Sequence, residues 1–223
     1  MNEKLREIFL RGCNEIATPL LSQGFKGKQK GQTISKKASK DLTLEIYFQS
    51  SYRNSESNIT IIPHINVFSK AVKEFDIKAY HNEHCSGRVY GEQLCYILGE
   101  EYRTWDLAKS NFSDTVLQLQ NAIVDSVLPI FEVFYRSPEE IMQHCIEGKL
   151  DISLSYFLVF GDKGLANLAL QKKIEKSSYK KRLVHFFNGL SQMDPKDIDP
   201  NYNEFVDAGW LKMAYLQGLR LKL

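Results

Sequence analysis

The sequence predicts an α+β protein, with an antiparallel sheet of about four to six strands packed by helices and an all-helical C-terminal extension. Apolar residues recur every three or four positions near the N-terminus, alternate with polar residues in the next segments, and return to helical spacing after residue 110. Hydrophobic residues make up 43% and charged residues 25% of the 223-residue chain. This composition is typical of a folded globular protein.

An amphipathic helix is expected from Asn2 to about Gln23, followed by Gly24. The next segments alternate apolar and polar residues, which predicts one strand over 43–49 and another over 59–67. Pro63 cannot donate a ladder hydrogen bond, so we expect a bulge or a sheet edge there. Further strands are expected within 28–37 and 87–97, and the short polar connectors favour an antiparallel meander.

Helical spacing is clearest over 112–134, where Pro129 should kink or end the helix. Ser137 and Glu140 have the spacing of a capping box, which marks a new helix start. The remaining chain is interpreted as helical over the segments 152–160, 163–175, 179–190 and 202–219. We therefore divide the chain into an α+β domain over 1–135 and a helical extension over 136–223, which could pack on the first domain.

The formal net charge of +2 does not by itself indicate a nucleic-acid or membrane partner. No export signal is recognised at the start, and the most apolar stretch, 152–160, is too short to cross a bilayer. The four cysteines are widely spaced and form no Cys-x-x-Cys pair. We expect a cytoplasmic protein with reduced thiols.

Several short motifs follow one another in an order that resembles a known family. They are Gly24-Phe25-Lys26 after the first helix, a lysine-rich turn, Ile46-Tyr47-Phe48-Gln49-Ser50-Ser51, Asn58-Ile59-Thr60-Ile61, Gly87-Arg88-Val89-Tyr90-Gly91 and Trp105. In this order they resemble the bacterial domain-of-unknown-function family numbered 4304, over roughly residues 1–135. The resemblance implies no catalytic residues. Some small bacterial proteins of this general type are suspected of neutralising toxins.

Candidate binding residues fall into three groups. The exposed sheet face is expected to present Tyr47, Gln49, His64 and Arg88. The lysine-rich turn, with Lys28 and Lys30, is interpreted as a solvated hairpin or as a docking patch for an acidic protein. The acidic segment around Asp197 and Asp199 could meet a basic partner or fold back onto the lysine-rich turn.

His81, His84 and Cys85 are weak candidates for zinc, because imidazole and thiolate suit that metal but no second ligand pair is apparent. We expect no metal and no other cofactor. A cysteine–histidine nucleophile pair has no local signature here, and Cys95 reads as a small buried apolar residue.

The sequence favours a non-enzymatic binding protein of a bacterium, and an immunity-type inhibitor of a toxin is its most concrete form. The expected partner is another protein, not nucleic acid or a membrane, and the oligomeric state stays open. One alternative is a hydrolase-like enzyme or zinc protein with a noncontiguous His/Cys site. Another is a polyanion or nucleic-acid binder that uses the lysine-rich turn.

Overall fold

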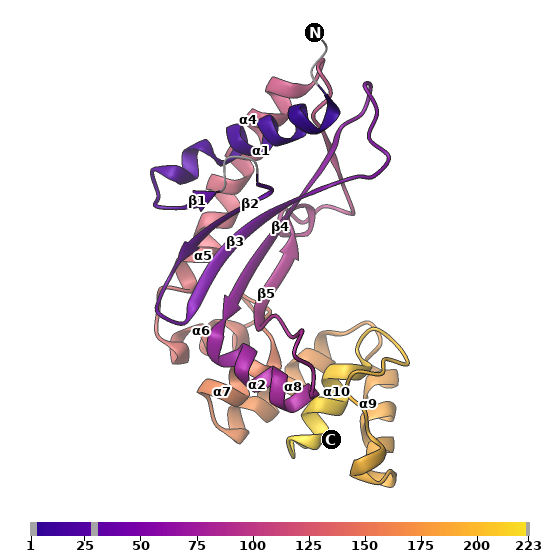
Figure 1. Ribbon diagram of the computed structural model, residues 1–223. Helices are drawn as coiled ribbons and strands as arrows, with labels where there is room; N and C mark the ends of the chain where they lie inside the picture. Colours follow the sequence, from indigo (N-terminus) through magenta and orange to yellow (C-terminus); the bar gives the residue numbers. More distant parts are fainter. Residues whose placement is uncertain (1–3, 28–30, 222–223) are drawn as a thin grey trace. The chain divides into compact units, whose positions relative to one another are not determined.

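The computed structural model describes residues 4–27 and 31–221, which form two compact units (Figure 1). Unit 1 comprises residues 1–68 and 90–136, and unit 2 comprises residues 69–89 and 137–223. The chain therefore passes between the units three times. Segment 69–89 groups with the C-terminal helices, although the sequence interpretation placed it in the N-terminal domain.

A six-stranded sheet forms the centre of unit 1. Its strands are β1 (Lys26–Gly27), β2 (Thr33–Lys37), β3 (Leu42–Ser50), β4 (Thr60–Ser69), β5 (Arg88–Gln93) and β6 (Trp105–Asp106). The strand order is β1-β2-β3-β4-β5, with β6 pairing to β4. The first division between the units falls before the last residue of β4, and the second falls within β5. The described pairings of β1 with β2, β2 with β3, and β4 with β6 are antiparallel. The predicted α+β class, with an antiparallel sheet packed by helices, is confirmed.

Side-chain alternation decides which face of the sheet is buried. On β3 the apolar positions Leu42, Leu44, Ile46 and Phe48 are buried, while Tyr47 and Gln49 are exposed. The helical layer of α1 (Leu5–Leu21), α4 (Phe112–Ala122) and α5 (Leu128–Val133) lies on one face of the sheet (Figure 1). Burial of this apolar face against the helices is the main source of stability in unit 1.

Pro129 is accommodated by a change of helical geometry. A π-helical segment, η1 (Ile123–Val127), joins α4 to α5, and Pro129 falls in the first turn of α5. A proline inside a helix lacks one donor and clashes with the preceding turn, and a wider turn relieves both problems.

Among the described residues, the stretch 112–133 is long and apolar enough to cross a membrane, but core helices satisfy the same criterion. Leu119, Val127 and Phe131 from this stretch are buried on the side that faces the sheet layer, and 28% of the apolar window is buried in all.

The prediction of a sheet edge at Pro63 is wrong, and the alternative of a bulge stays a prediction. Strand β4 runs through Pro63 and lies inside the sheet, between β3 and β5. The residues Ile61, Pro63, Ile65 and Val67 are all buried, so the alternation does not shift at the proline. Pro63 follows the two residues of β4 that pair with β6, near the point where the neighbouring strand changes.

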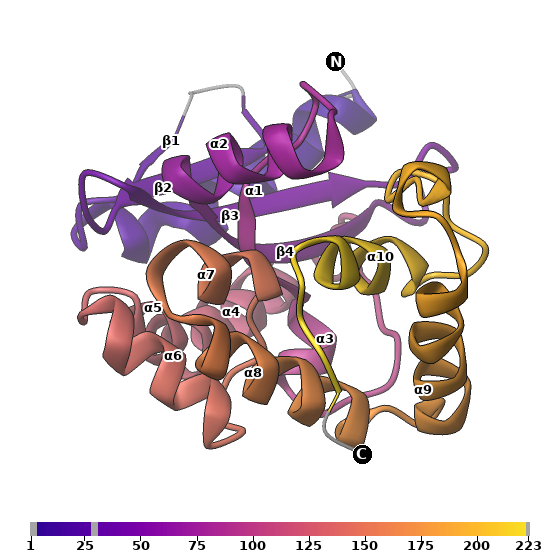
Figure 2. The ribbon, with the colours of Figure 1, turned by 90° about the horizontal axis from the view of Figure 1, so that it is seen from below.

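Unit 2 is built from helices (Figures 1 and 2). They are α2 (Lys70–Tyr80), α6 (Pro138–Ile146), α7 (Leu154–Phe160), α8 (Lys163–Lys176), α9 (Lys180–Gly189) and α10 (Ala208–Leu216). Helix α7 packs against α2 and α8, and α9 packs against α8 and α10. The predicted capping box is confirmed, because Glu140 N donates to Ser137 Oγ and Ser137 N donates to Glu140 Oε2.

Two helical assignments differ from the sequence interpretation. Helix α2 was not expected, yet Ser69 caps it, with its Oγ accepting a hydrogen bond from Val72 N at 3.0 Å. The helix predicted over 202–219 begins only at Ala208. The residues before Ala208 form turns, because Asn203 Oδ1 accepts from Gly209 N and the Lys212 ammonium binds the carbonyl oxygen of Tyr202.

Candidate functional site

The sheet face opposite the helices of unit 1 carries an ordered group of polar side chains. We call Glu45, Tyr47, Gln49, His64 and Asn66 the outer-face cluster. His64 Nε2 lies 2.7 Å from Gln49 Oε1, and the rings of Tyr47 and His64 are 5.9 Å apart between centroids. Asn66 Nδ2 lies 3.4 Å from Glu45 Oε1. Three of the predicted binding residues are thus brought together from neighbouring strands.

The outer-face cluster is partly shielded from solvent. Burial raises the pKa of Glu45, and the hydrogen bond from Asn66 partly offsets that effect. Tyr47 keeps 36% of its surface exposed, so its ring is available for contact. At the neighbouring edge, Lys37 Nζ donates to Thr43 Oγ1 at 2.6 Å. Hydrogen bonds and a ring contact thus connect the side chains of the cluster to one another.

Arg88, the fourth predicted residue of this face, does not join the cluster. It is exposed, but it shares its side of β5 with Tyr90, whose ring lies 6.1 Å from that of Phe134 in the helical layer. Lys28 and Lys30 lie outside the described residues. In strand β2, the Lys36 ammonium lies over the Tyr135 ring at 4.9 Å.

A lysine of unit 2, Lys212, binds several groups of the acidic segment around Asp197 and Asp199. The side chain of Lys212 is almost completely buried, and its ammonium lies 2.8 Å from Glu204 Oε1. The same ammonium donates to the carbonyl oxygens of Asp199 and Tyr202. The side chain of Asp199 accepts from Asn201 N, so it stabilises a local turn. Asp197 is exposed and falls in a short 3-10 helix, Pro195–Asp197.

The proposed zinc ligands belong to the turn that follows α2. His81 ends the helix in a left-handed conformation with φ 50°, and His84 N donates to Asn82 Oδ1. Within residues 4–27 and 31–221, no group of three or more His, Cys, Asp or Glu side chains is placed to hold a metal ion.

All four cysteines are free thiols, and the pKa is raised for three of them, Cys13, Cys85 and Cys145. Burial raises the pKa of Cys13 to about 12. Burial and the negative charge of Asp76 raise the pKa of Cys85, and burial also raises that of Cys145. A catalytic cysteine needs a lowered pKa, because the thiolate is the nucleophile. Cys95 is fully buried, which confirms the interpretation of it as a core residue.

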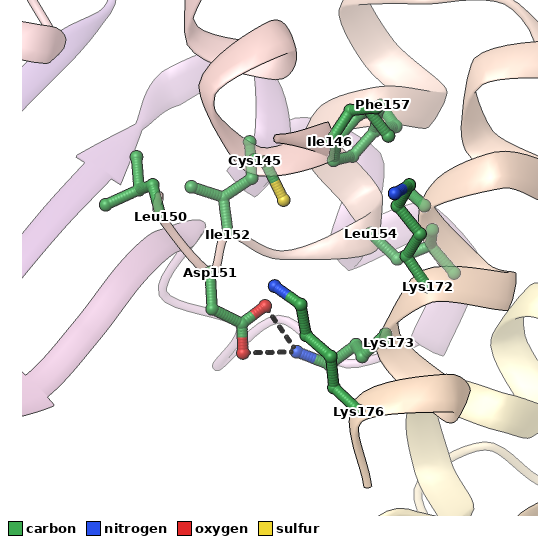
Figure 3. Close-up of a pocket in the computed structure, with 11 residues that line it drawn as sticks. Cys145, Ile146, Leu150, Asp151, Ile152, Leu154, Phe157, Lys172, Lys173 and Lys176 are labelled. Atoms are coloured by element: carbon green, nitrogen blue, oxygen red, sulfur yellow. Dashed lines mark hydrogen bonds and ion pairs between the residues drawn. The ribbon is translucent and has the colours of Figure 1, made fainter. Parts of the chain in front are cut away.

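A small pocket in unit 2 was not foreseen from the sequence (Figure 3). Its walls come from α6, α7, α8 and the segment between α6 and α7, with Cys145, Ile152 and Phe157 among them. Lys172, Lys173 and Lys176 of α8 also line it, and Lys173 Nζ lies 2.9 Å from both carboxylate oxygens of Asp151 (Figure 3). The cavity volume is about 20 Å³, enough for about one water molecule.

A second, open groove in unit 2 has a volume of about 380 Å³. It is lined by Tyr80, Cys85, Trp210 and three asparagines. The asparagine side chains are engaged in local hydrogen bonds, such as that from Asn82 Nδ2 to Asn201 Oδ1 at 3.3 Å. This hydrogen bond joins two residues that line the groove.

The fold of unit 1 is that of an α+β protein, with helices packed on one face of an antiparallel sheet. The outer-face cluster lies on the opposite face. Residues 16–133, more than half of the chain, match the family described as domain of unknown function (DUF4304). The protein belongs to this family, and the resemblance seen in its N-terminal motifs is confirmed. Neither a curated protein nor a solved structure gives a significant match.

Proposed function

We propose that this protein is a non-enzymatic binding protein that holds another protein against the outer-face cluster of unit 1. The observation that carries this proposal is the ordered contact between Gln49 and His64 beside the exposed ring of Tyr47. Tyrosine offers a large contact area with few rotatable bonds, and it is enriched among residues that dominate binding energy. Side chains that are already ordered lose little rotamer freedom on binding.

The most concrete form of this function is an immunity-type inhibitor that acts in the bacterial cytoplasm. Such a protein needs a preorganised surface and no catalytic group of its own. The alternative of a cysteine-dependent enzyme is less favoured, because the pKa of Cys85 is raised and not lowered.

Site-specific photo-crosslinking tests the proposal. Benzoylphenylalanine is placed at position 47, and in a control protein at position 135, where Tyr135 has a similar exposure of 39% but follows α5 in the helical layer. Each protein is irradiated with the products of the reading frames adjacent to its gene. We expect one of these products to crosslink at position 47 and not at position 135. Equal crosslinking at both positions, or none at position 47 by a product that copurifies with the protein, would contradict the proposal.

A further inference from the structure

Positive charge is concentrated where α8 ends and α9 begins. Segment 172–182 contains six basic residues and one acidic residue, Glu175. We call its basic residues the α8–α9 basic strip, which consists of Lys172, Lys173, Lys176, Lys180, Lys181 and Arg182. The net charge of +2 for the whole chain hides this strip, because the acidic segment 194–207 offsets it.

Most of this charge is not neutralised inside the protein. Lys173 pairs with Asp151, and the Arg182 guanidinium lies over the Phe205 ring at 4.4 Å. Among the described residues, no ion pair involves the other four members of the strip, which are Lys172, Lys176, Lys180 and Lys181. Three of these four lysines are exposed, and Lys172 is partly exposed. The strip therefore presents unpaired ammonium groups to solvent.

Helix stability does not account for the whole strip. Lys173 and Lys176 lie in the last turn of α8, where positive charge is favourable to the helix dipole. Lys180, Lys181 and Arg182 lie in the first turn of α9, where positive charge is unfavourable and no acidic residue offsets it. These three cations therefore oppose formation of the helix that carries them, which points to a role outside folding.

Three lysines in the C-terminal part of α8 gather at one place (Figure 3). Lys172, Lys173 and Lys176 all border the small pocket, and Asp151 is the one carboxylate among its lining residues. This carboxylate is occupied by Lys173. The pocket itself is too small for a ligand, so an anion would lie across its mouth and not inside it.

An exposed aromatic ring lies within the strip. Tyr179 is 66% exposed and stands between Lys176 and Lys180 in the sequence. Proteins that bind single-stranded nucleic acid combine lysines for the phosphates with aromatic rings on which bases stack. An acidic peptide would use the lysines but would have no base to stack on the ring.

We propose that the α8–α9 basic strip binds single-stranded nucleic acid, with its lysines on the phosphates and Tyr179 stacked on a base. This site lies in unit 2 and is separate from the protein-binding role of the outer-face cluster. It also differs from the lysine-rich turn near the N-terminus.

The test is fluorescence anisotropy of a labelled single-stranded oligonucleotide, titrated with the full-length protein between about 50 and 200 mM salt. Wild type is compared with a K176Q/K180Q/K181Q variant. Each phosphate contact on a single strand contributes about 0.7 to the slope of log K against log salt, so the variant's slope should be shallower by about 2. A Tyr179→Ala variant should bind about tenfold more weakly with an unchanged slope.

A charge-matched control removes three exposed lysines of unit 1, as K26Q/K40Q/K109Q. Circular dichroism establishes that every variant is folded. We expect the control to bind like wild type. The proposal is overturned if wild type does not bind, if the control loses as much affinity as the strip variant, or if polyglutamate of equal charge competes as well as unlabelled oligonucleotide.

Discussion

His64 Nε2 lies 2.7 Å from Gln49 Oε1, which links the outward-facing side chains of strands β3 and β4. Because an amide oxygen accepts hydrogen bonds, the imidazole donates from Nε2 in this arrangement. The contact holds both side chains beside Tyr47 and makes the outer-face cluster a defined surface.

Removal of this contact should cost little stability. A His64→Ala variant should lower the free energy of unfolding by about 1 kcal/mol, because a partly exposed hydrogen bond contributes modestly to stability. Urea denaturation followed by circular dichroism measures the change. A loss above about 3 kcal/mol would mean that His64 is a structural residue of the sheet.

The pH dependence of stability should report on Asp76. Burial raises the pKa of this carboxyl despite the hydrogen bond that Ser155 Oγ donates to Asp76 Oδ1 at 2.6 Å. A group whose pKa is raised by folding favours the folded state when protonated, so its contribution is full below about pH 4 and is lost as pH rises through the folded pKa. The D76N variant keeps an acceptor for Ser155 and does not titrate.

The D76N variant should therefore gain stability relative to wild type as pH rises from about 4 to 7. Urea midpoints of the two proteins across this range give the comparison. A constant difference, or one that moves in favour of wild type, would show that Asp76 is not destabilised by burial.

Two glycines with the same positive φ should respond differently to alanine. Gly87 and Gly99 both have φ +71°, which costs an L-residue about 1 kcal/mol. A Cβ on Gly87 would lie 2.4 Å from the carbonyl oxygen of Ser69 and 2.5 Å from Lys73 Cβ, whereas nothing lies within 4 Å of one on Gly99. Gly87→Ala should therefore cost about 3 kcal/mol or more, and Gly99→Ala about 1 kcal/mol.

Thermal and urea denaturation of the two glycine variants test the packing around the turn that precedes β5. If both substitutions cost the same, then the close approach of Gly87 to the start of α2 does not exist in solution.

The buried ammonium of Lys212 should contribute more to the free energy of unfolding than its carboxylate partner, Glu204. Lys212→Met leaves the carbonyl oxygens of Asp199 and Tyr202 without their donor, and we expect a loss of about 1–3 kcal/mol. Burial tends to raise the pKa of Glu204. The hydrogen bond and the positive charge of Lys212 oppose this effect and hold that pKa below its ordinary value. Because Glu204 is well exposed, Glu204→Gln should cost less than about 1 kcal/mol. Urea denaturation of both variants checks this order, and a larger cost for Glu204→Gln would contradict it.

Periodicity predicts β3 and the helices α1 and α4 of unit 1 because each of them buries one apolar face. Residues 94–97, within a segment expected to hold strands, form the short helix α3 instead. The alternation of Leu44, Ile46 and Phe48 with Tyr47 and Gln49 is sufficient to predict β3 and the side of the sheet that its polar residues occupy. Pro63 misled the prediction, because the missing donor matters only where a neighbouring strand requires it.

Unit 2 was harder to predict because its order depends on contacts between residues far apart in the sequence. Helix α2 was overlooked although Ser69 is a good capping residue, since only Val72 among its residues is buried. The sequence shows Lys212 only as a lysine in an apolar helix. Its role as a buried donor could not be predicted, because its partners come from the preceding turn. The α8–α9 basic strip was visible in the sequence, but its lack of partners emerged only from the structure.

The affinity of the partner found by crosslinking tests the central claim most directly. Isothermal titration calorimetry compares wild type with Tyr47→Ala and with Tyr135→Ala as the control of similar exposure. If the outer-face cluster is the binding surface, Tyr47→Ala should weaken binding about 30-fold, as expected for an interface tyrosine worth about 2 kcal/mol, and Tyr135→Ala should change it less than about twofold. Unchanged affinity of the Tyr47→Ala variant, with the protein still folded, would contradict the account.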